Sequence, residues 1–188
     1  ACLAVRDAAQ HQGVSCRFVG TGQAGILISG RGVALDAVRV DYAAGAVESA
    51  VMAEAEGLTS DDMLLVEGQG SLCHPGSTAT LPLLRGSQPT GLLLVHRAAQ
   101  ATISRLPQVP LPPLSELVQL YEALAAIARP AGASPAVKVR AVALNTAHLD
   151  DDDANRWLTA TENELNLPCV DPIRHGAETL LKALRIQF

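Results

Sequence analysis

The sequence predicts an α/β domain with a largely parallel sheet, and three observations support this. Short apolar runs alternate with segments of helical periodicity along most of the 188 residues. The run at 63–66 is unbroken, as in strands that are buried on both faces. Glycines and polar residues follow the runs, as expected where parallel strands end. Because no repeat or boundary interrupts this pattern, we predict a single domain over residues 1–188.

The composition, 48% hydrophobic and 18% charged, is typical of a soluble globular domain. A net charge of −5 argues against nucleic acid as a partner. The sequence has neither an apolar run of about 18 residues nor a signal peptide, so we expect no membrane partner and a cytoplasmic location. The four scattered cysteines contain no CxxC pair and indicate reduced thiols. A small-molecule substrate is the expected partner, and a homo-oligomer is an open alternative.

The first half of the chain opens with an amphipathic segment, and residues 1–12 are predicted to form a helix that Gly13 ends. Alternating apolar residues then predict a strand at 14–20, and a second short strand is predicted at 38–40. Alanine and valine at helical spacing predict a helix at 42–56.

In the second half, a helix is predicted at 77–85 and a strand at 91–96. Residues 106–114 contain four prolines and predict an extended connector. The clearest helix is predicted at 115–128, with Ser115 as its N-cap. The remaining predicted elements are a loop at 130–135, strands at 137–144 and 168–170, and helices at 150–165 and 177–185.

Glu67 follows the apolar run at 63–66 and begins a Gly-Gln-Gly-Ser turn. At the end of a parallel strand it would project into the crevice where ligands bind in such sheets. Gly68 and Gly70 would let the backbone approach a ligand closely. A carboxylate in this position suits a magnesium ligand or a general base. The alternative is an ordinary strand-to-helix turn with a solvated Glu67.

Polar groups also follow the other predicted strands, so we expect one edge of the sheet to carry a functional crevice. These loops are at 21–23, 96–97, 145–146 and 171–175. His74 and His96 are candidate acid–base groups because an unperturbed imidazole titrates near pH 6.5. For each of them, a surface or hydrogen-bonded histidine without catalytic function is the alternative.

Two further motifs are weak signals. The glycines at 21–25 resemble a phosphate loop but lack its lysine, and no GxxxxGK[ST] motif occurs in these residues. The four aspartates at 150–153 suggest calcium, but acidic residues at a helix N-terminus are the simpler explanation because they complement the helix dipole.

Several motifs, in one order over nearly the whole chain, resemble those of a known family. They are FVGTGQAGI at 18–26, DA at 36–37, DYAAGAVE at 41–48, LVEGQGSLCHP at 65–75, LRGSQP at 84–89 and ALNT at 143–146. Their order is similar to the C-terminal P-loop domain of a family long labelled as of unknown function, which includes bacterial D-glutamate N-acetyltransferases. The turn after Glu67 and the strand end at Asn145 more distantly resemble dethiobiotin synthetase.

The resemblance implies a three-layer P-loop-type fold whose first strand and phosphate loop would lie before residue 1, after a smaller Rossmann-like domain. It implies a metal-facing role for Glu67 and a base-contacting position for Asn145. The pocket it implies adds Gln23, Asp41, Glu48, Gln69, Ser71 and His74; together with the strand-end glycines, the predicted binding residues are Thr21, Gly22, Gln23, Asp41, Glu48, Gly68, Gln69, Gly70, Ser71 and Asn145.

Three functions follow as hypotheses. The first is an acetyl-CoA-dependent N-acetyltransferase that acts on a D-amino acid such as D-glutamate, with Glu67 or His74 as the catalytic base. The second is a ligase or NTPase of the dethiobiotin synthetase kind, with ATP and with Mg²⁺ on Glu67. The third is a ligand-binding module without turnover.

Overall fold

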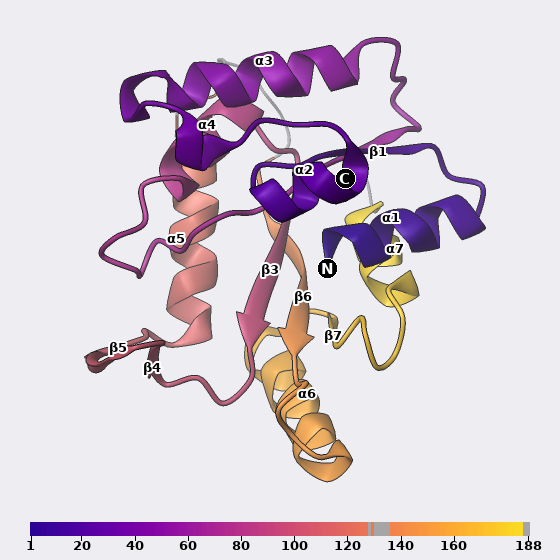
Figure 1. The fold of residues 1–188 in the computed structure, drawn as a ribbon. Coiled ribbons are helices and arrows are strands. Elements are labelled where there is room, and N and C mark those ends of the chain that lie inside the picture. The colour runs from indigo at the N-terminus through magenta and orange to yellow at the C-terminus, as the bar shows by residue number, and fades with distance from the viewer. Residues whose placement is uncertain (128, 130–135, 186–188) are drawn as a thin grey trace. The chain divides into compact units, whose positions relative to one another are not determined.

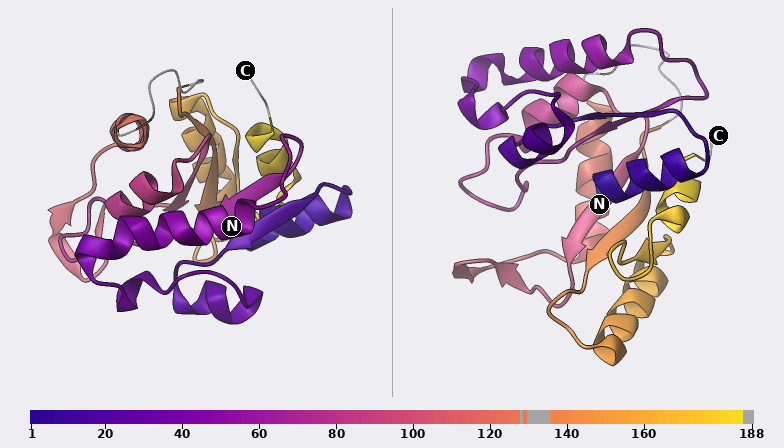
Figure 2. Two further views of the ribbon diagram at one scale, coloured as in Figure 1. Left: turned by 90° about the horizontal axis from the view of Figure 1, so that it is seen from above. Right: turned by 45° about the vertical axis from the view of Figure 1, so that its right-hand side comes forward.

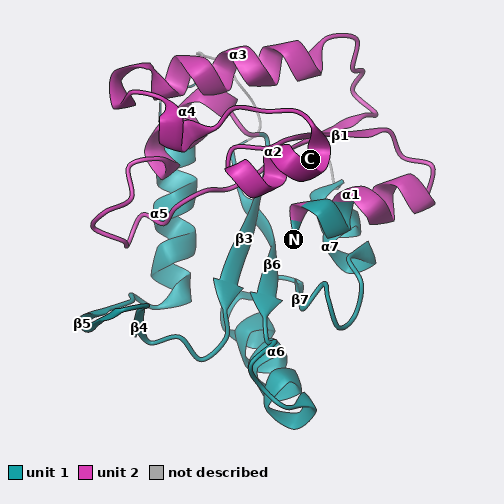
Figure 3. Ribbon diagram, in the orientation of Figure 1, with its two compact units in different colours: residues 1, 3–5, 90–188 teal, residues 2, 6–89 magenta. Residues whose placement is uncertain are grey.

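The computed structural model describes residues 1–127, 129 and 136–185, so the loop predicted at 130–135 lies outside the described residues. The described chain forms two compact units (Figure 3). Unit 2 comprises residue 2 and residues 6–89, and unit 1 comprises residues 1, 3–5 and 90–188. The prediction of one domain over 1–188 stays a prediction.

Unit 2 is built on two parallel strands and the helices around them (Figure 1). Its elements are α1 (Cys2–His11, shared with unit 1), β1 (Cys16–Val19), α2 (Gln23–Ser29), η1 (Leu35–Ala37), η2 (Val40–Tyr42), α3 (Ala43–Ala55), β2 (Met63–Val66) and α4 (Thr80–Ser87).

The pairing of β1 with β2 brings two distant parts of the sequence together. Cys16 pairs with Met63 and Val19 pairs with Val66, in parallel register. The core of unit 2 lies beside these strands; its buried residues are Leu35, Ala43, Val47 and Leu83, with Val66 of β2 packed against them. The register places the turn that follows β1 directly beside Glu67, which follows β2.

Unit 1 holds a three-stranded parallel sheet and a separate hairpin. Its elements are β3 (Leu92–Arg97), β4 (Thr102–Ile103), β5 (Leu106–Pro110), α5 (Leu114–Ala126), β6 (Val139–Asn145), α6 (Asp151–Leu165), β7 (Cys169–Val170) and α7 (Glu178–Leu184). The strand order is β3-β6-β7, and β3 and β6 remain side by side in both views of Figure 2.

The central strand of unit 1, β6, is almost wholly buried because it has a neighbour on each side. Ala141, Val142, Ala143 and Leu144 are each at most 1% exposed. Leu144 also belongs to a core cluster with Ala98 and Leu158. Such an unbroken apolar strand is what a parallel sheet requires, and the burial ends at Asn145, which is exposed.

Most predicted elements are confirmed, including the strand at 63–66 and the parallel pairing. The helix at the start also ends as predicted, because Gly13 adopts φ +70° and Val14 donates to the Ala9 carbonyl. Among the described residues, no helix combines the length and apolar character needed to cross a bilayer.

Three local predictions are wrong. The strand predicted at 38–40 is replaced by the 3₁₀ turns η1 and η2; Leu35 and Val38 pack against the core, whereas Val40 is exposed. The connector predicted at 106–114 begins with the strand β5, which tolerates its prolines because it belongs to a two-stranded hairpin. Ser115 is not the N-cap, because α5 begins at Leu114 and Pro113 precedes it.

Candidate functional site

Glu67 is held in a fixed position at the junction of β1, β2 and α2. Its Oε2 accepts hydrogen bonds from the backbone N–H groups of Thr21, at 2.9 Å, and Gly22, at 3.0 Å. The Thr21 hydroxyl donates to the Glu67 carbonyl at 2.9 Å, and Thr21 itself is fully buried. Among the described residues, Oε1 accepts no hydrogen bond. The carboxylate is therefore anchored through one oxygen, and the other remains able to accept a proton or bind a cation.

Gly25 makes this arrangement possible because α2 passes very close to the carboxylate. A Cβ at Gly25 would overlap the Glu67 side chain. The Glu67 carboxylate cannot move away without breaking its bonds to Thr21 and Gly22.

Gly25→Ala is therefore expected to destabilise the protein, whereas Gly45→Ala is expected to stabilise it. Alanine gains up to about 1 kcal/mol of helix propensity at both sites. At Gly25 this gain is outweighed by the loss of the two hydrogen bonds from Thr21 and Gly22 to the Glu67 carboxylate, each worth about 1.5–3 kcal/mol. A Cβ at Gly45 in α3 meets no atom within 4 Å. Urea unfolding measures both changes, and equal effects of the two substitutions would contradict the close approach.

Gln69 and Asp36 form a second pair near Glu67. The Gln69 Nε2 donates to the Asp36 Oδ1 at 2.5 Å, and the Thr80 hydroxyl donates to the Gln69 carbonyl at 3.1 Å. A Cβ placed on Gly22 would lie 3.5 Å from the Gln69 Oε1 and 3.8 Å from the Glu67 Oε2. The side chains of Glu67 and Gln69 thus meet over the bare backbone of Gly22.

The loop that follows is ordered by its own side chains. Ser71 donates its N–H to the Ser77 hydroxyl at 3.2 Å, and the N–H of Cys73 donates to the Ser71 hydroxyl at 3.2 Å. The N–H of Gly76 donates to the His74 Nδ1 at 3.1 Å. Because Nδ1 acts as the acceptor, a neutral His74 carries its proton on Nε2.

Cys2 is a neighbour of this site that sequence reasoning does not identify. Burial raises the pKa of the Cys2 thiol, and the negative charge of Glu67 raises it further. A backbone hydrogen bond with Gly68 acts in the opposite direction. The thiol therefore stays protonated near neutral pH, which argues against Cys2 as a nucleophile.

The remaining predicted residues of unit 2 are less tightly placed. Gln23 begins α2, Asp41 lies in η2 and Glu48 lies in α3, and all three are exposed. No hydrogen bond or ion pair of their side chains occurs within the described part of the chain. Nor does that part contain a group of three or more His, Cys, Asp or Glu side chains able to hold a metal ion. Glu67 as a metal ligand stays a prediction.

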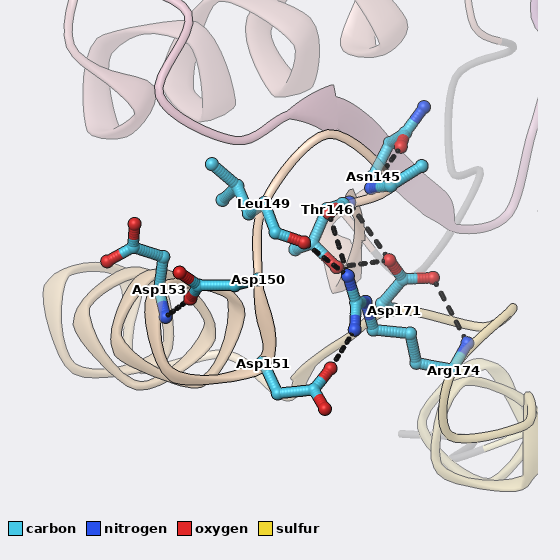
Figure 4. A network of polar contacts seen from close by, with 9 residues as sticks. Asn145, Thr146, Leu149, Asp150, Asp151, Asp153, Asp171 and Arg174 are labelled. Carbon is cyan, nitrogen blue, oxygen red and sulfur yellow. Dashed lines mark hydrogen bonds and ion pairs between the residues drawn. The ribbon is translucent and has the colours of Figure 1, made fainter.

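In unit 1, a network of polar contacts joins the loops that follow β6 and β7 (Figure 4). Asp171, which is 2% exposed, accepts hydrogen bonds from the N–H and hydroxyl of Thr146 and from the N–H groups of Ile173 and Arg174. The Arg174 guanidinium donates to the carbonyls of Thr146 and Leu149 and pairs with Asp151. These contacts bind the two loops together.

The electrostatics of Asp171 follow from this network. Burial alone would raise the pKa of the Asp171 carboxyl, but the hydrogen bonds from Thr146, Ile173 and Arg174 outweigh it and lower that pKa. The carboxylate is therefore ionised at neutral pH and serves as a structural acceptor.

The network also determines how Asn145 is presented. Its Oδ1 accepts the N–H of Ala147 at 3.0 Å, so its Nδ2 is the group left exposed as a donor. In the sheet Asn145 pairs with Arg97, the residue after His96, so the ends of β3 and β6 coincide. Burial lowers the pKa of His96, which keeps it neutral at physiological pH. The prediction that all five strand-end loops share one edge stays a prediction.

The four aspartates at the start of α6 have the structural role that the sequence favoured. Asp150 is the N-cap, and its carboxylate accepts the N–H of Asp153 at 2.8 Å. Asp151 pairs with Arg174, and Asp153 pairs with Arg156. These contacts engage three of the four aspartates, and all four lie where they complement the dipole of α6.

Parallel strand pairs, intervening helices and polar strand-end loops define an α/β protein. A family model described as "Domain of unknown function (DUF1611_C) P-loop domain" matches residues 1–181. The chain belongs to this family.

Two curated relatives and one solved structure resemble the chain over 97% of its length. The relatives, from Tritonibacter scottomollicae and a Pseudoalteromonas species, are 38% and 34% identical to it, and each is named D-glutamate N-acetyltransferase. The structure is a DUF1611 family protein from Anabaena variabilis, with 52% identity and a TM-score of 0.89. The chain covers 52% of each of these proteins, about half their length.

Proposed function

We propose that the chain forms part of an acetyl-CoA-dependent N-acetyltransferase that acts on a D-amino acid such as D-glutamate. The reaction class rests on the two relatives described above, which share the name and align over nearly the whole chain. The geometry of unit 2 adds a suitable acid–base group, because the Glu67 carboxylate is anchored through Oε2 and its Oε1 accepts no hydrogen bond from the described residues.

Glu67 is the base in this proposal. The amine nitrogen attacks the thioester carbonyl carbon, a C–N bond forms, and the C–S bond to coenzyme A breaks. The nitrogen must lose a proton, which Glu67 Oε1 accepts, and the departing thiolate acquires a proton to become the free thiol. The hydrogen bonds from the backbone N–H groups of Thr21 and Gly22 prevent the carboxylate from turning away during this step.

His74 has a different role in this proposal. Because its Nδ1 accepts the Gly76 N–H, the neutral ring presents an N–H at Nε2 and lacks a free basic nitrogen. That N–H is suited to stabilise the oxyanion that develops on the thioester oxygen. Of the two candidate bases, the geometry favours Glu67.

His74→Asn is expected to lower kcat about 100-fold, the typical effect of removing one oxyanion donor. Asparagine at this position can still accept the N–H two residues later, so the turn is retained while the Nε2–H is lost. Steady-state kinetics of the full-length protein measure the change, with the exposed His11→Asn as the control. An unchanged kcat would exclude His74 from the reaction.

The other residues would bind the substrates. In this proposal, the loops at Thr21, Gly22, Gln23, Gly68, Gly70 and Ser71, with Asp41 and Glu48, line the substrate pocket. Asn145 offers its exposed Nδ2 to a ring nitrogen or carbonyl of the coenzyme. Mg²⁺ and ATP are not part of this reaction.

A ligase or NTPase that uses ATP and Mg²⁺ is the second candidate, because the family is a P-loop family and Oε1 of Glu67 is free for a cation. Thermal unfolding of the full-length protein separates the candidates. A ligand at 100 times its Kd stabilises the folded state by about 2.7 kcal/mol. We expect this effect with acetyl-CoA and not with ATP–Mg²⁺. The opposite result supports the ligase or NTPase, and no effect of either ligand, together with no turnover, supports a non-catalytic binding module.

A further inference from the structure

The side-chain oxygen of Gln69, Oε1, is buried without a hydrogen-bond partner in the described part of the chain. A buried carbonyl oxygen without a donor is costly, so such atoms in native proteins call for an explanation. Its neighbour Nε2 is engaged with Asp36 at 2.5 Å.

Asp36 fixes which end of the amide is left unpaired. An ionised carboxylate only accepts hydrogen bonds, so the amide must turn its NH₂ group toward Asp36. The oxygen is thereby turned toward Gly22, where a Cβ would lie 3.5 Å from it. The backbone of Gln69 is held as well, because its carbonyl accepts the Thr80 hydroxyl. The orientation of this acceptor is therefore set before any ligand binds.

The surroundings of Gln69 are suited to a positively charged donor. The Glu67 carboxylate also lies over Gly22, where a Cβ would be 3.8 Å from the Glu67 Oε2. Three of the five arginines of the same unit are committed elsewhere: Arg6 pairs with Asp7, Arg17 donates to carbonyls at the end of α3, and Arg31 pairs with Glu54. The Gln69 amide oxygen and the Glu67 carboxylate lie over a bare glycine, and Asp36 adds a second carboxylate behind them, so the surroundings favour an ammonium group.

We propose that Gln69 Oε1 and Glu67 Oε1 together bind the amino group of the substrate, and that Asp36 is the residue that positions the Gln69 amide. This inference rests on the proposed N-acetyltransferase function and specifies where the reacting nitrogen is held. Gly68, which precedes Gln69, is exposed, and a Cβ there would meet no atom within 4 Å, so there is open space beside Gln69. An ammonium group brings three donors, so it can satisfy both oxygens at once.

The test compares two ligands that differ only in the amine, D-glutamate and its desamino analogue glutarate, by calorimetry with the full-length protein. We expect Gln69→Met to weaken D-glutamate binding roughly 10- to 100-fold and to leave glutarate binding unchanged. Asp36→Asn is expected to have a smaller effect in the same direction, because an asparagine permits the Gln69 amide to reverse. The control is Gln10→Met, at an exposed position on α1.

Two other readouts distinguish a binding role from a structural one. Gln69→Met removes the unpaired oxygen together with the exposed hydrogen bond from Nε2 to Asp36, so without ligand it should melt close to the wild-type temperature. A melting temperature several degrees lower would overturn the inference. So would equal weakening of both ligands, or stabilisation by Mg²⁺ alone that Gln69→Met abolishes.

Failure of the inference is distinguishable from failure of the proposed function. If wild-type protein acetylates D-glutamate but Gln69→Met binds it normally, only the inference is overturned. If wild-type protein does not bind D-glutamate, the proposed substrate is wrong, and D- and L-amino acids are compared with their desamino analogues. The inference stands if Gln69→Met removes the tighter binding of at least one amino acid over its desamino analogue. It is overturned if the substitution does so for none of them.

Discussion

Glu67→Gln is expected to lower kcat about 1000-fold while leaving the free energy of unfolding within about 1 kcal/mol of wild type. The glutamine amide oxygen can still accept the N–H groups of Thr21 and Gly22, so the junction of β1, β2 and α2 is retained. The amide has no basic oxygen, so the proton of the amine cannot be removed. Steady-state kinetics and urea unfolding of the full-length protein measure the two effects.

Comparison with two other variants makes this result specific. Glu67→Ala leaves two backbone donors without an acceptor and is expected to lose about 2–4 kcal/mol of stability as well as activity. Glu56→Gln removes the same charge from an exposed position in the same unit and should change neither quantity. Normal turnover by Glu67→Gln would exclude Glu67 as the base and leave it the structural role alone.

Asp171→Ala is expected to destabilise the protein by about 3–5 kcal/mol, the largest stability effect that the structure predicts. The substitution leaves the N–H and hydroxyl of Thr146 and the N–H groups of Ile173 and Arg174 without their acceptor in a buried site. Asp151→Asn removes an exposed carboxylate from the same network and should cost less than about 1 kcal/mol. Urea unfolding compares the two, and similar losses would contradict the role of Asp171.

The stabilisation from Asp171 should also depend on pH. The pKa of Asp171 in the folded protein is lower than its ordinary value of 3.8. As the pH falls through 3.8, the unfolded chain therefore takes up the proton before the folded protein does. Stability from this group is therefore complete above about pH 5 and declines as the pH falls below 4 toward the folded-state pKa. The difference in unfolding free energy between wild type and Asp171→Asn should shrink between pH 5 and pH 3. A difference that grows over this range would contradict the direction of the shift.

The sequence predicts the parallel strands well because burial on both faces leaves a local signature. The run at 63–66 coincides with β2, and Glu67 is found at the strand end as predicted. The apolar residues 26–28 are too few to assign from periodicity, and they lie in the seven-residue helix α2. Only the pairing of β1 with β2 shows why α2 must begin at Gln23, beside the Glu67 carboxylate.

What the sequence could not predict are contacts between residues far apart in the chain. The bonds from Thr21 and Gly22 to Glu67 span 46 and 45 positions, and Gln69 meets Asp36 across 33. Local periodicity contains no information on such register. Asp171 illustrates the same limit, because its loop was recognised as polar while its burial and its four donors depend on the packing of β6 beside β7.

Release of coenzyme A from acetyl-CoA by the full-length protein, measured with D-glutamate and with L-glutamate, tests the proposed function and the role of Glu67 together. We predict faster release with D-glutamate in the wild type and a roughly 1000-fold loss in Glu67→Gln. Equal rates in wild type and Glu67→Gln would contradict the role of Glu67, and no release with any D-amino acid would contradict the proposed function.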